Sequence, residues 1–236
     1  MKIIMLAAGR GERLRPLTDK IPKPLIEVAG RPIIEHILDS MIKLPDAKIV
    51  IVVGYLGDQI VKRLGSRYRG VKISYIFQEE TLGTGHATLL ARKFIGSDPF
   101  VLYLADTYIV DDLEKITEKL AKGKGSRIVV SRVSKDKALN SGQVILSDGK
   151  VIDMAEKPAK LLSDVVAAGM YYFYPQILEY LQRLSDGKTL ELTNGIRELL
   201  KHEKVEAVWA KTFIDIGTRA GLKAANDFLK GKTVAE

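Results

Sequence analysis

Short apolar runs alternate with segments of helical periodicity along the first half of this chain. The apolar runs cover residues 3–7, 48–53, 71–77, 100–105 and 128–133. Between them, apolar residues recur at helical spacing in 31–44, 58–64, 84–94 and 111–121. Strands that alternate with helices predict an α/β fold, with a mixed, mostly parallel sheet and helices on both faces. In such folds, ligands bind beyond the carboxyl ends of the strands.

The pattern changes after residue 135. Residues 143–146 and 150–155 predict a β-hairpin, because the intervening Asp148-Gly149 suits a tight turn. The remaining pattern predicts a strand at 165–173, helices at 175–183 and 192–202, a strand near 205–209, a short segment at 212–216 and a helix at 219–229 that Thr218 can cap. No internal repeat or linker interrupts residues 1–236, so we expect a single domain.

Composition narrows the class of protein. With 46% hydrophobic residues among 236, the chain can bury a substantial core, and it contains no apolar run long enough to span a bilayer. The absence of cysteine excludes disulfides and thiolate metal sites, and three scattered histidines make a zinc site unexpected. The net charge of +8 is spread along the chain, without a basic arm. We therefore expect a cytoplasmic protein with no nucleic-acid or membrane partner.

Residues 6–25, LAAGRGERLRPLTDKIPKPL, directly follow the first predicted strand. Backbone amides can converge on an anion at such a turn, and Gly9 and Gly11 would let the main chain approach a phosphate. The stretch is not a dinucleotide-binding fingerprint, because Leu14 occupies the third glycine position, and it is not a Walker loop. The pattern therefore indicates a phosphate loop of another kind.

Arg13, Arg15 and Lys23 add fixed positive charge to this loop. They would suit a triphosphate whose charge grows as a leaving group departs, although solvated loop charges are the simpler explanation when the loop is taken alone. The sequence LAAGRGERLRPLT, with PKPL beginning at Pro22, resembles the signature of the sugar-1-phosphate nucleotidyltransferases. That spacing is long and specific, so the resemblance favours the phosphate-binding interpretation.

The resemblance implies a magnesium-dependent enzyme that condenses a nucleoside triphosphate with a sugar 1-phosphate and releases pyrophosphate. It implies a Rossmann-like, glycosyltransferase-A-like fold, in which about 1–135 bind the nucleotide and about 136–236 supply the sugar-phosphate side and a second metal ligand. In the opening loop it implies nucleotide contacts from Leu6, Ala7, Ala8, Gly9 and Gly11, and catalytic roles for Arg13 toward the leaving pyrophosphate and Lys23 toward the triphosphate.

The segment 78–87, QEETLGTGHA, is similar to the base-recognition segment of this family. Gln78 carries a donor and an acceptor together, which is the pattern that the imide edge of uracil or thymine requires. Gly83 and Gly85 would leave room for a flat base, and Thr84 would begin the next helix beside it. A plain strand-to-helix turn capped by Thr84 explains the segment equally well on its own.

Two aspartates resemble the metal ligands of the family. Asp106 ends an apolar strand, and Asp215 lies in the late segment FIDIGT. Magnesium takes one or two protein carboxylates and completes its shell with phosphates and water. The family usually has glycine where Ala105 stands, and a role for Asp215 as the cap of the last helix is the alternative.

The sugar-phosphate side resembles the family at Gly142, at Glu156-Lys157 and at Gly169. Glu156 would accept hydrogen bonds from sugar hydroxyls, and Lys157 would pair with the anomeric phosphate. A Glu-Lys-Pro tripeptide is ordinarily only a strand end, so its order in the chain carries this assignment. Ser141 stands where the family often has an aromatic residue, which predicts a different sugar contact.

These assignments predict transfer from UTP or dTTP to a sugar 1-phosphate, with glucose 1-phosphate favoured. The alternatives are another phosphate monoester as acceptor, or a non-catalytic sensor with the same fold, and the oligomeric state is left open, a homo-oligomer included. A glycosyltransferase would need an Asp-x-Asp motif, whereas Asp106 is followed by Thr107-Tyr108. Glu12 replaces a small hydroxyl residue of the family, and we expect its carboxylate to turn away from the phosphates.

Overall fold

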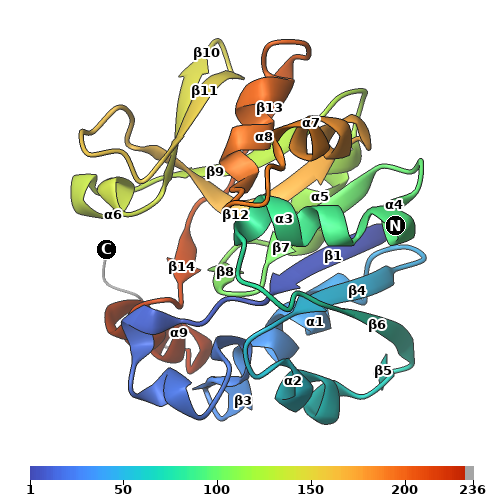
Figure 1. Cartoon of the computed structure of the whole chain (residues 1–236). Coiled ribbons are helices and arrows are strands. Elements are labelled where there is room, and N and C mark those ends of the chain that lie inside the picture. Colours follow the sequence, from blue (N-terminus) through green and yellow to red (C-terminus); the bar gives the residue numbers. More distant parts are fainter. Residues whose placement is uncertain (232–236) are drawn as a thin grey trace.

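Strand β1 (Lys2–Ala7) lies between β4 (Lys48–Val53) and β7 (Phe100–Leu104) in the computed structural model, which describes residues 1–231 (Figure 1). Both pairings are parallel, and β6 (Val71–Phe77) continues the parallel set beyond β4. The registers place Ala7 opposite Val53, and Val53 opposite Phe77. The carboxyl ends of these strands therefore meet at one edge of the sheet, where the sequence predicts the ligand.

The whole sheet has ten strands in the order β10-β11-β13-β9-β12-β7-β1-β4-β6-β5. The other strands are β5 (Arg67–Tyr68), β9 (Arg127–Arg132), β10 (Gly142–Ser147), β11 (Lys150–Glu156), β12 (Val165–Phe173) and β13 (Val205–Trp209). β12 runs antiparallel to both β7 and β9, and β10 and β11 form an antiparallel hairpin. The expected mostly parallel order therefore holds for β1, β4, β6 and β7, whereas in the rest of the sheet parallel pairing of β13 with β9 is mixed with antiparallel pairs. Parallel pairing needs a long crossover connection, and β10, β11 and β12 follow one another without a helix between them.

Helices cover both faces of the sheet, as predicted. Successive side chains of β1 point to opposite sides, so Ile3 and Met5 belong to one core cluster and Ile4 and Leu6 to the other. The first cluster includes side chains of α1 (Ile33–Met41), α2 (Gly57–Leu64), α5 (Leu113–Ala121), α6 (Lys135–Leu139) and α9 (Arg219–Leu229). The second includes side chains of α3 (Gly83–Leu90), α4 (Arg92–Ile95), α7 (Gln176–Leu184) and α8 (Leu192–Leu199).

Several boundaries differ from the predicted ones. The single helix expected at 84–94 is broken at Ala91 into α3 and α4, and α1 begins only after Pro32. Periodicity misses several short elements: the 3-10 turns η1 (Glu12–Leu14), η2 (Leu17–Asp19) and η3 (Lys23–Leu25), the helix α6, and the two-stranded sheet of β2 (Glu27–Val28) with β3 (Arg31–Pro32). It also misses β8 (Thr107–Ile109), whereas the partner strand β14 (Phe213–Asp215) lies within the short segment expected at 212–216. These elements are too short for periodicity to reveal them.

The hairpin turn and the cap of the last helix are found where the sequence predicts them. Asp148 and Gly149 both have positive φ, 48° and 74°, as the tight hairpin turn requires. The hydroxyl of Thr218 accepts a hydrogen bond from the amide of Gly221 at 3.0 Å, so Thr218 caps α9. Within residues 1–231, no helix combines the length and apolarity needed to cross a bilayer.

We predict that Leu38→Ala, in the fully buried face of α1, lowers the free energy of unfolding by about 2–5 kcal/mol, because it leaves a cavity in the core. The matched control is Leu184→Ala in α7, whose leucine is 39% exposed, and it should change this free energy by roughly 0.5 kcal/mol or less. Urea unfolding measures both variants. Equal losses in the two would contradict the placement of α1 against the sheet.

Candidate active site

Asp106 and Asp215 are brought together by a short antiparallel ladder that lies outside the ten-stranded sheet. β14 pairs with β8, with Asp215 opposite Thr107, and the amide of Ile216 donates to the carbonyl oxygen of Asp106 at 2.9 Å. This ladder follows directly on the carboxyl end of β7. The two carboxylates therefore lie next to each other at the edge where the parallel strands end.

Each carboxylate is paired with a cation from the opening loop. Lys23 Nζ lies 2.6 Å from Asp106 Oδ2, and Arg13 Nη2 lies 3.4 Å from Asp215 Oδ2. Burial alone would raise the pKa of Asp106, but the charge and hydrogen bond of Lys23, with a smaller contribution from Arg13, hold that pKa below its ordinary value. The Lys23 side chain is 9% exposed and that of Asp106 39%, so the pair is desolvated mainly on the lysine side.

Gly217 lies where these charges meet. A Cβ atom there would come within 2.5 Å of Lys23 Nζ, 2.7 Å of Arg13 Nη2 and 2.8 Å of Asp215 Oδ1. The Gly217 amide also donates to Asp215 Oδ1 at 2.7 Å. The absence of a side chain at Gly217 therefore lets both cations approach the carboxylates.

The alternative role of Asp215 as a helix cap is wrong, because Thr218 caps α9 instead. The helix nevertheless fixes the position of Asp215: a Cβ atom on Gly221 would fall 1.7 Å from the carbonyl oxygen of Asp215. The backbone of α9 thus packs directly against the residue that carries the second carboxylate.

Two cavities, of about 340 and about 140 Å³, adjoin at Asp106, and Asp215 lines the smaller one. Leu104, Asp106, Glu156, Lys157, Tyr171 and Thr193 line both. The candidate residues that line the larger one are Leu6, Ala7, Ala8, Gly9, Lys23, Gln78, Gly83, Thr84, Asp106, Glu156 and Lys157. The smaller one adds Arg13, Gly142, Gly169 and Asp215. Gly11, Arg15 and Gly85, also named from the sequence, line neither cavity.

The two glycines of the opening loop have different roles: Gly9 faces a cavity, whereas Gly11 serves the packing of the loop. Gly9 lines the larger cavity, and a Cβ atom there would meet no atom within 4 Å. Gly11 has φ of 68°, and a Cβ atom would come within 2.9 Å of Thr18 Cγ2, so the packing of the loop requires this glycine. Glu12 is exposed and lines neither cavity, as the charge argument predicts.

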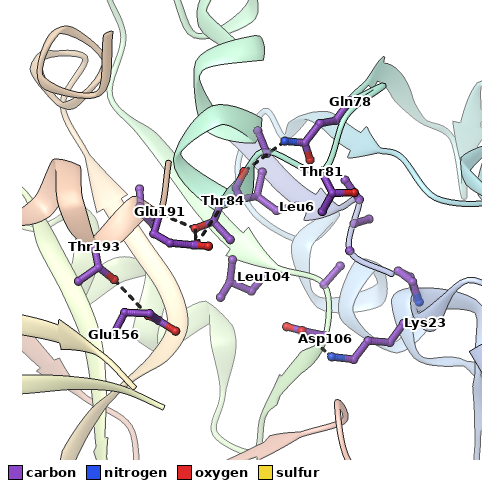
Figure 2. A pocket seen from close by; sticks show the side chains of 18 of the residues that line it. Leu6, Lys23, Gln78, Thr81, Thr84, Leu104, Asp106, Glu156, Glu191 and Thr193 are labelled. Carbon is purple, nitrogen blue, oxygen red and sulfur yellow. Dashed lines mark hydrogen bonds and ion pairs between the residues drawn. The ribbon is translucent and has the colours of Figure 1, made fainter. Parts of the chain in front are cut away.

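Gln78 is buried on the wall of the larger cavity, and its amide group is already engaged. Figure 2 shows Gln78 on this wall. Its Nε2 lies 3.2 Å from the carbonyl oxygen of Gly83 and 2.9 Å from His86 Nδ1. With both amide hydrogens used in this arrangement, Gln78 presents only its oxygen, an acceptor for an imide N–H. His86, which the sequence did not indicate, orients the side chain.

The space left by the glycines of α3 is filled by protein. Cβ atoms on Gly83 and Gly85 would come within 2.5 and 2.9 Å of the carbonyl oxygen of Leu190. The space beside these glycines is therefore occupied by Leu190, and not left for a base as expected, although Gly83 lines the larger cavity. Thr84 does not cap α3 either, because its hydroxyl donates to Glu191 Oε2 at 2.7 Å and accepts from the amide of Leu192 at 2.9 Å.

On the other side of the cavities, Glu156 Oε2 accepts a hydrogen bond from Thr193 Oγ1 at 3.2 Å, and Glu156 Oε1 lies 3.3 Å from Lys157 Nζ. Lys157 has positive φ of 40°, a strained conformation for a lysine. Gly142 leaves room for Glu156, since a Cβ atom there would lie 3.2 Å from Glu156 Oε2. Gly169 likewise leaves room for Thr107, whose Oγ1 would be 2.8 Å away.

Tyr171 is a site residue that sequence reasoning missed. It is only 6% exposed, and among residues 1–231 its hydroxyl has no hydrogen-bond partner, yet it lines both cavities. Burial raises the pKa of Tyr171, so the hydroxyl stays protonated and can donate. Its place in an apolar strand gave no sign of this position.

Within residues 1–231, no group of three or more histidine, cysteine, aspartate or glutamate side chains is placed to hold a metal ion. Asp106 and Asp215 offer two carboxylates beside an open cavity, with side chains that are 39% and 28% exposed. This donor set suits Mg²⁺, which takes few protein ligands and keeps water and phosphate in its shell.

Residues 2–232 match the family described as Nucleotidyl transferase. The chain is 34% identical to the UTP–glucose-1-phosphate uridylyltransferase AglF of Haloferax volcanii, over 85% of this chain and 84% of that protein. It is 35% identical to the bifunctional protein GlmU of Methanocaldococcus jannaschii, over 98% of this chain and 55% of that protein. This chain therefore belongs to the nucleotidyltransferase family, and the resemblance to its sugar-1-phosphate branch is confirmed.

Solved structures agree with this assignment. A Bacillus anthracis protein described as a glucose-1-phosphate thymidylyltransferase superposes with a TM-score of 0.90 at 27% identity, over 100% of this chain and 98% of that chain. A UDP-glucose pyrophosphorylase bound to UDP-glucose superposes with a TM-score of 0.83 at 26% identity, over 98% and 99%. The chain spans about half the length of the archaeal GlmU proteins that it matches, 55% to 56%.

We predict that Gly85→Ala lowers the free energy of unfolding by about 1–3 kcal/mol, because the new methyl group displaces the Leu190 carbonyl. Helix propensity alone would favour alanine at this position by about 1 kcal/mol, so the sign of the effect is diagnostic. Gly9→Ala, where a Cβ atom meets open space, should stay within roughly 0.5 kcal/mol of the parent. Stabilisation by Gly85→Ala in a urea titration would show that residue 190 does not pack there.

Proposed function

We propose that this chain transfers a nucleotidyl group from UTP or dTTP to a sugar 1-phosphate, with glucose 1-phosphate favoured, and releases pyrophosphate. The observation that carries the proposal is the pair of cavities that adjoin at Asp106, which pairs with Lys23, with Asp215 and Arg13 on the wall of the smaller one. The similarity to relatives named as uridylyl- and thymidylyltransferases supports it. The parallel half of the sheet and its flanking helices support a Rossmann-like, glycosyltransferase-A-like arrangement.

In this proposal the larger cavity takes the nucleotide and the smaller one the sugar. Gln78 would accept from the imide N–H of the base, and the open backbone at Gly9 would face the phosphates. Glu156 and Tyr171 would meet the sugar hydroxyls, with Lys157 beside the sugar phosphate. Residues of about 1–135 and about 136–236 would thus serve the two substrates.

An oxygen of the sugar phosphate would attack the α-phosphorus, and the bond from that phosphorus to the bridging oxygen of the pyrophosphate would break. The attacking oxygen is ionised at neutral pH, so no general base is needed, and the protein acts by positioning and charge neutralisation. Asp106 and Asp215 would hold Mg²⁺, which supplies positive charge to the phosphate oxygens when bound. Arg13 and Lys23, which neutralise the carboxylates in this structure, would turn to the triphosphate.

A matrix of nucleoside triphosphates against sugar 1-phosphates, with pyrophosphate detection, tests the reaction itself. We expect the highest turnover with UTP or dTTP and glucose 1-phosphate, and its loss on chelation of divalent cations. A higher rate with another hexose phosphate would change only the acceptor. No pyrophosphate from any pair would instead favour a non-catalytic sensor built on the same fold.

The charge argument predicts that Arg13→Ala lowers kcat/KM by roughly 10²- to 10³-fold, because one cation near the reacting phosphates is lost. Arg63→Ala is the matched control: Arg63 is 53% exposed against 49% for Arg13, and it also pairs with a carboxylate, Glu35, at 2.7 Å. Turnover by the Arg63 variant should be unchanged, and circular dichroism should show both variants folded. Equal turnover of the Arg13 variant and the parent would remove Arg13 from the mechanism.

A further inference from the structure

Residues 190–193, here called the crossbar, connect the two sides of the cavities (Figure 2). One end of the crossbar is docked on the start of α3 through the backbone. The carbonyl oxygen of Leu190 accepts from the amides of Gly85 at 2.8 Å and His86 at 3.3 Å, and the Leu190 amide donates to Leu82 at 2.8 Å. This end therefore moves with the segment that carries the proposed base contact.

Glu191 fixes the middle of the crossbar. Its Oε2 accepts from the hydroxyl of Thr84 at 2.7 Å, and its side chain also accepts from the amide of Asn194 in a capping box at the start of α8. Asn194 Oδ1 in turn accepts from the Glu191 amide at 3.2 Å. Although Glu191 lines the larger cavity, its carboxylate is occupied by donors of the protein, which fits a positioning role and not a ligand contact.

The other end of the crossbar reaches the sugar-phosphate side. Thr193 Oγ1 donates to Glu156 Oε2 at 3.2 Å, and Glu156 lines both cavities. Hydrogen bonds thus link Thr84 to Glu191 at one end and Thr193 to Glu156 at the other, and the backbone of the first turn of α8 joins the two links. A shift of α8 would change the position of both ends together.

We propose that the crossbar couples nucleotide binding to sugar-phosphate binding, with Glu191 as the positioning residue. A nucleotide against α3 and a sugar phosphate on Glu156 would each fix the position of the same four residues, so the ligand that binds first would favour the position that the second one needs. The inference rests on the proposed function, because it assigns the two cavities to these two substrates.

Titration calorimetry with Mg²⁺, glucose 1-phosphate and the α,β-methylene analogue of UTP tests the coupling, because that analogue cannot be cleaved at the bond in question. The parent protein should bind the analogue roughly 5- to 20-fold more tightly when glucose 1-phosphate is present. In Glu191→Ala this factor should fall below about 2-fold. The affinity of the variant for each ligand alone should differ from that of the parent by less than about 3-fold. Glu191→Gln keeps an acceptor for Thr84 and should retain most of the factor.

Glu198→Ala is the matched control, because Glu198 lies on the same helix and pairs only with Lys201 and His202 on the surface. It should couple the ligands as the parent does. Thr84→Val removes the hydroxyl with little change in shape, so it tests the same link if Glu191→Ala does not fold. The proposal would be overturned if folded Glu191→Ala or Thr84→Val coupled the two ligands as strongly as the parent does. It would also be overturned if the parent itself showed a factor of one.

The outcomes separate the crossbar from the reaction. Pyrophosphate release by a parent protein that binds its two ligands independently would refute the crossbar and leave the proposed function standing. Absence of pyrophosphate with every substrate pair would refute the proposed function, whatever the binding data show.

Discussion

The candidate site depends on the pairing of β14 with β8. This ladder is three residues long, and it places a carboxylate from late in the chain beside one that follows the central parallel strands. α9 packs against its far side, where Gly221 touches the backbone of Asp215. Without this pairing the opening loop would face one carboxylate, and its two cations would have one partner between them.

Charge balance explains why the loop takes the shape that it has. Lys23 and Arg13 each pair with one carboxylate, and Gly217 leaves the room in which the four groups meet. A triphosphate and a sugar phosphate would add several negative charges to this point. The same cations can therefore stabilise the protein without substrate and neutralise phosphate oxygens with it, because the two states offer them competing anions.

The sequence predicted the members of the site better than their contacts. A long motif carries the residue types of a phosphate site, so Arg13, Lys23, Asp106 and Asp215 could be named before their geometry was known. The neighbour that fills the space beside Gly85 is Leu190, which is distant in sequence, and no local pattern could identify it. For the same reason the roles of the side chains around α3 changed: a hydroxyl expected to cap the helix instead holds Glu191.

The fold shows the same division. Periodicity predicted the long helices and strands, because each buries a full face, whereas the mixed strand directions depend on which strands pair. Glu191 and Asn194 form a capping box in the structure, but they lack the Ser/Thr-x-x-Glu/Gln signature of that motif, so no local pattern pointed to Glu191. Tyr171 had the sequence context of a core residue, because it lies in an apolar strand and its side chain is buried.

The ladder of β8 and β14 forms a sheet of its own, separate from the ten-stranded one. The distance between the two carboxylates therefore depends on α9, which packs against Asp215, as well as on β7, which Asp106 follows. Substitutions in α9 that touch no substrate would alter how closely the carboxylates can approach a shared cation. Under the proposed function, cation binding would therefore respond to changes in the last helix as well as in the central strands.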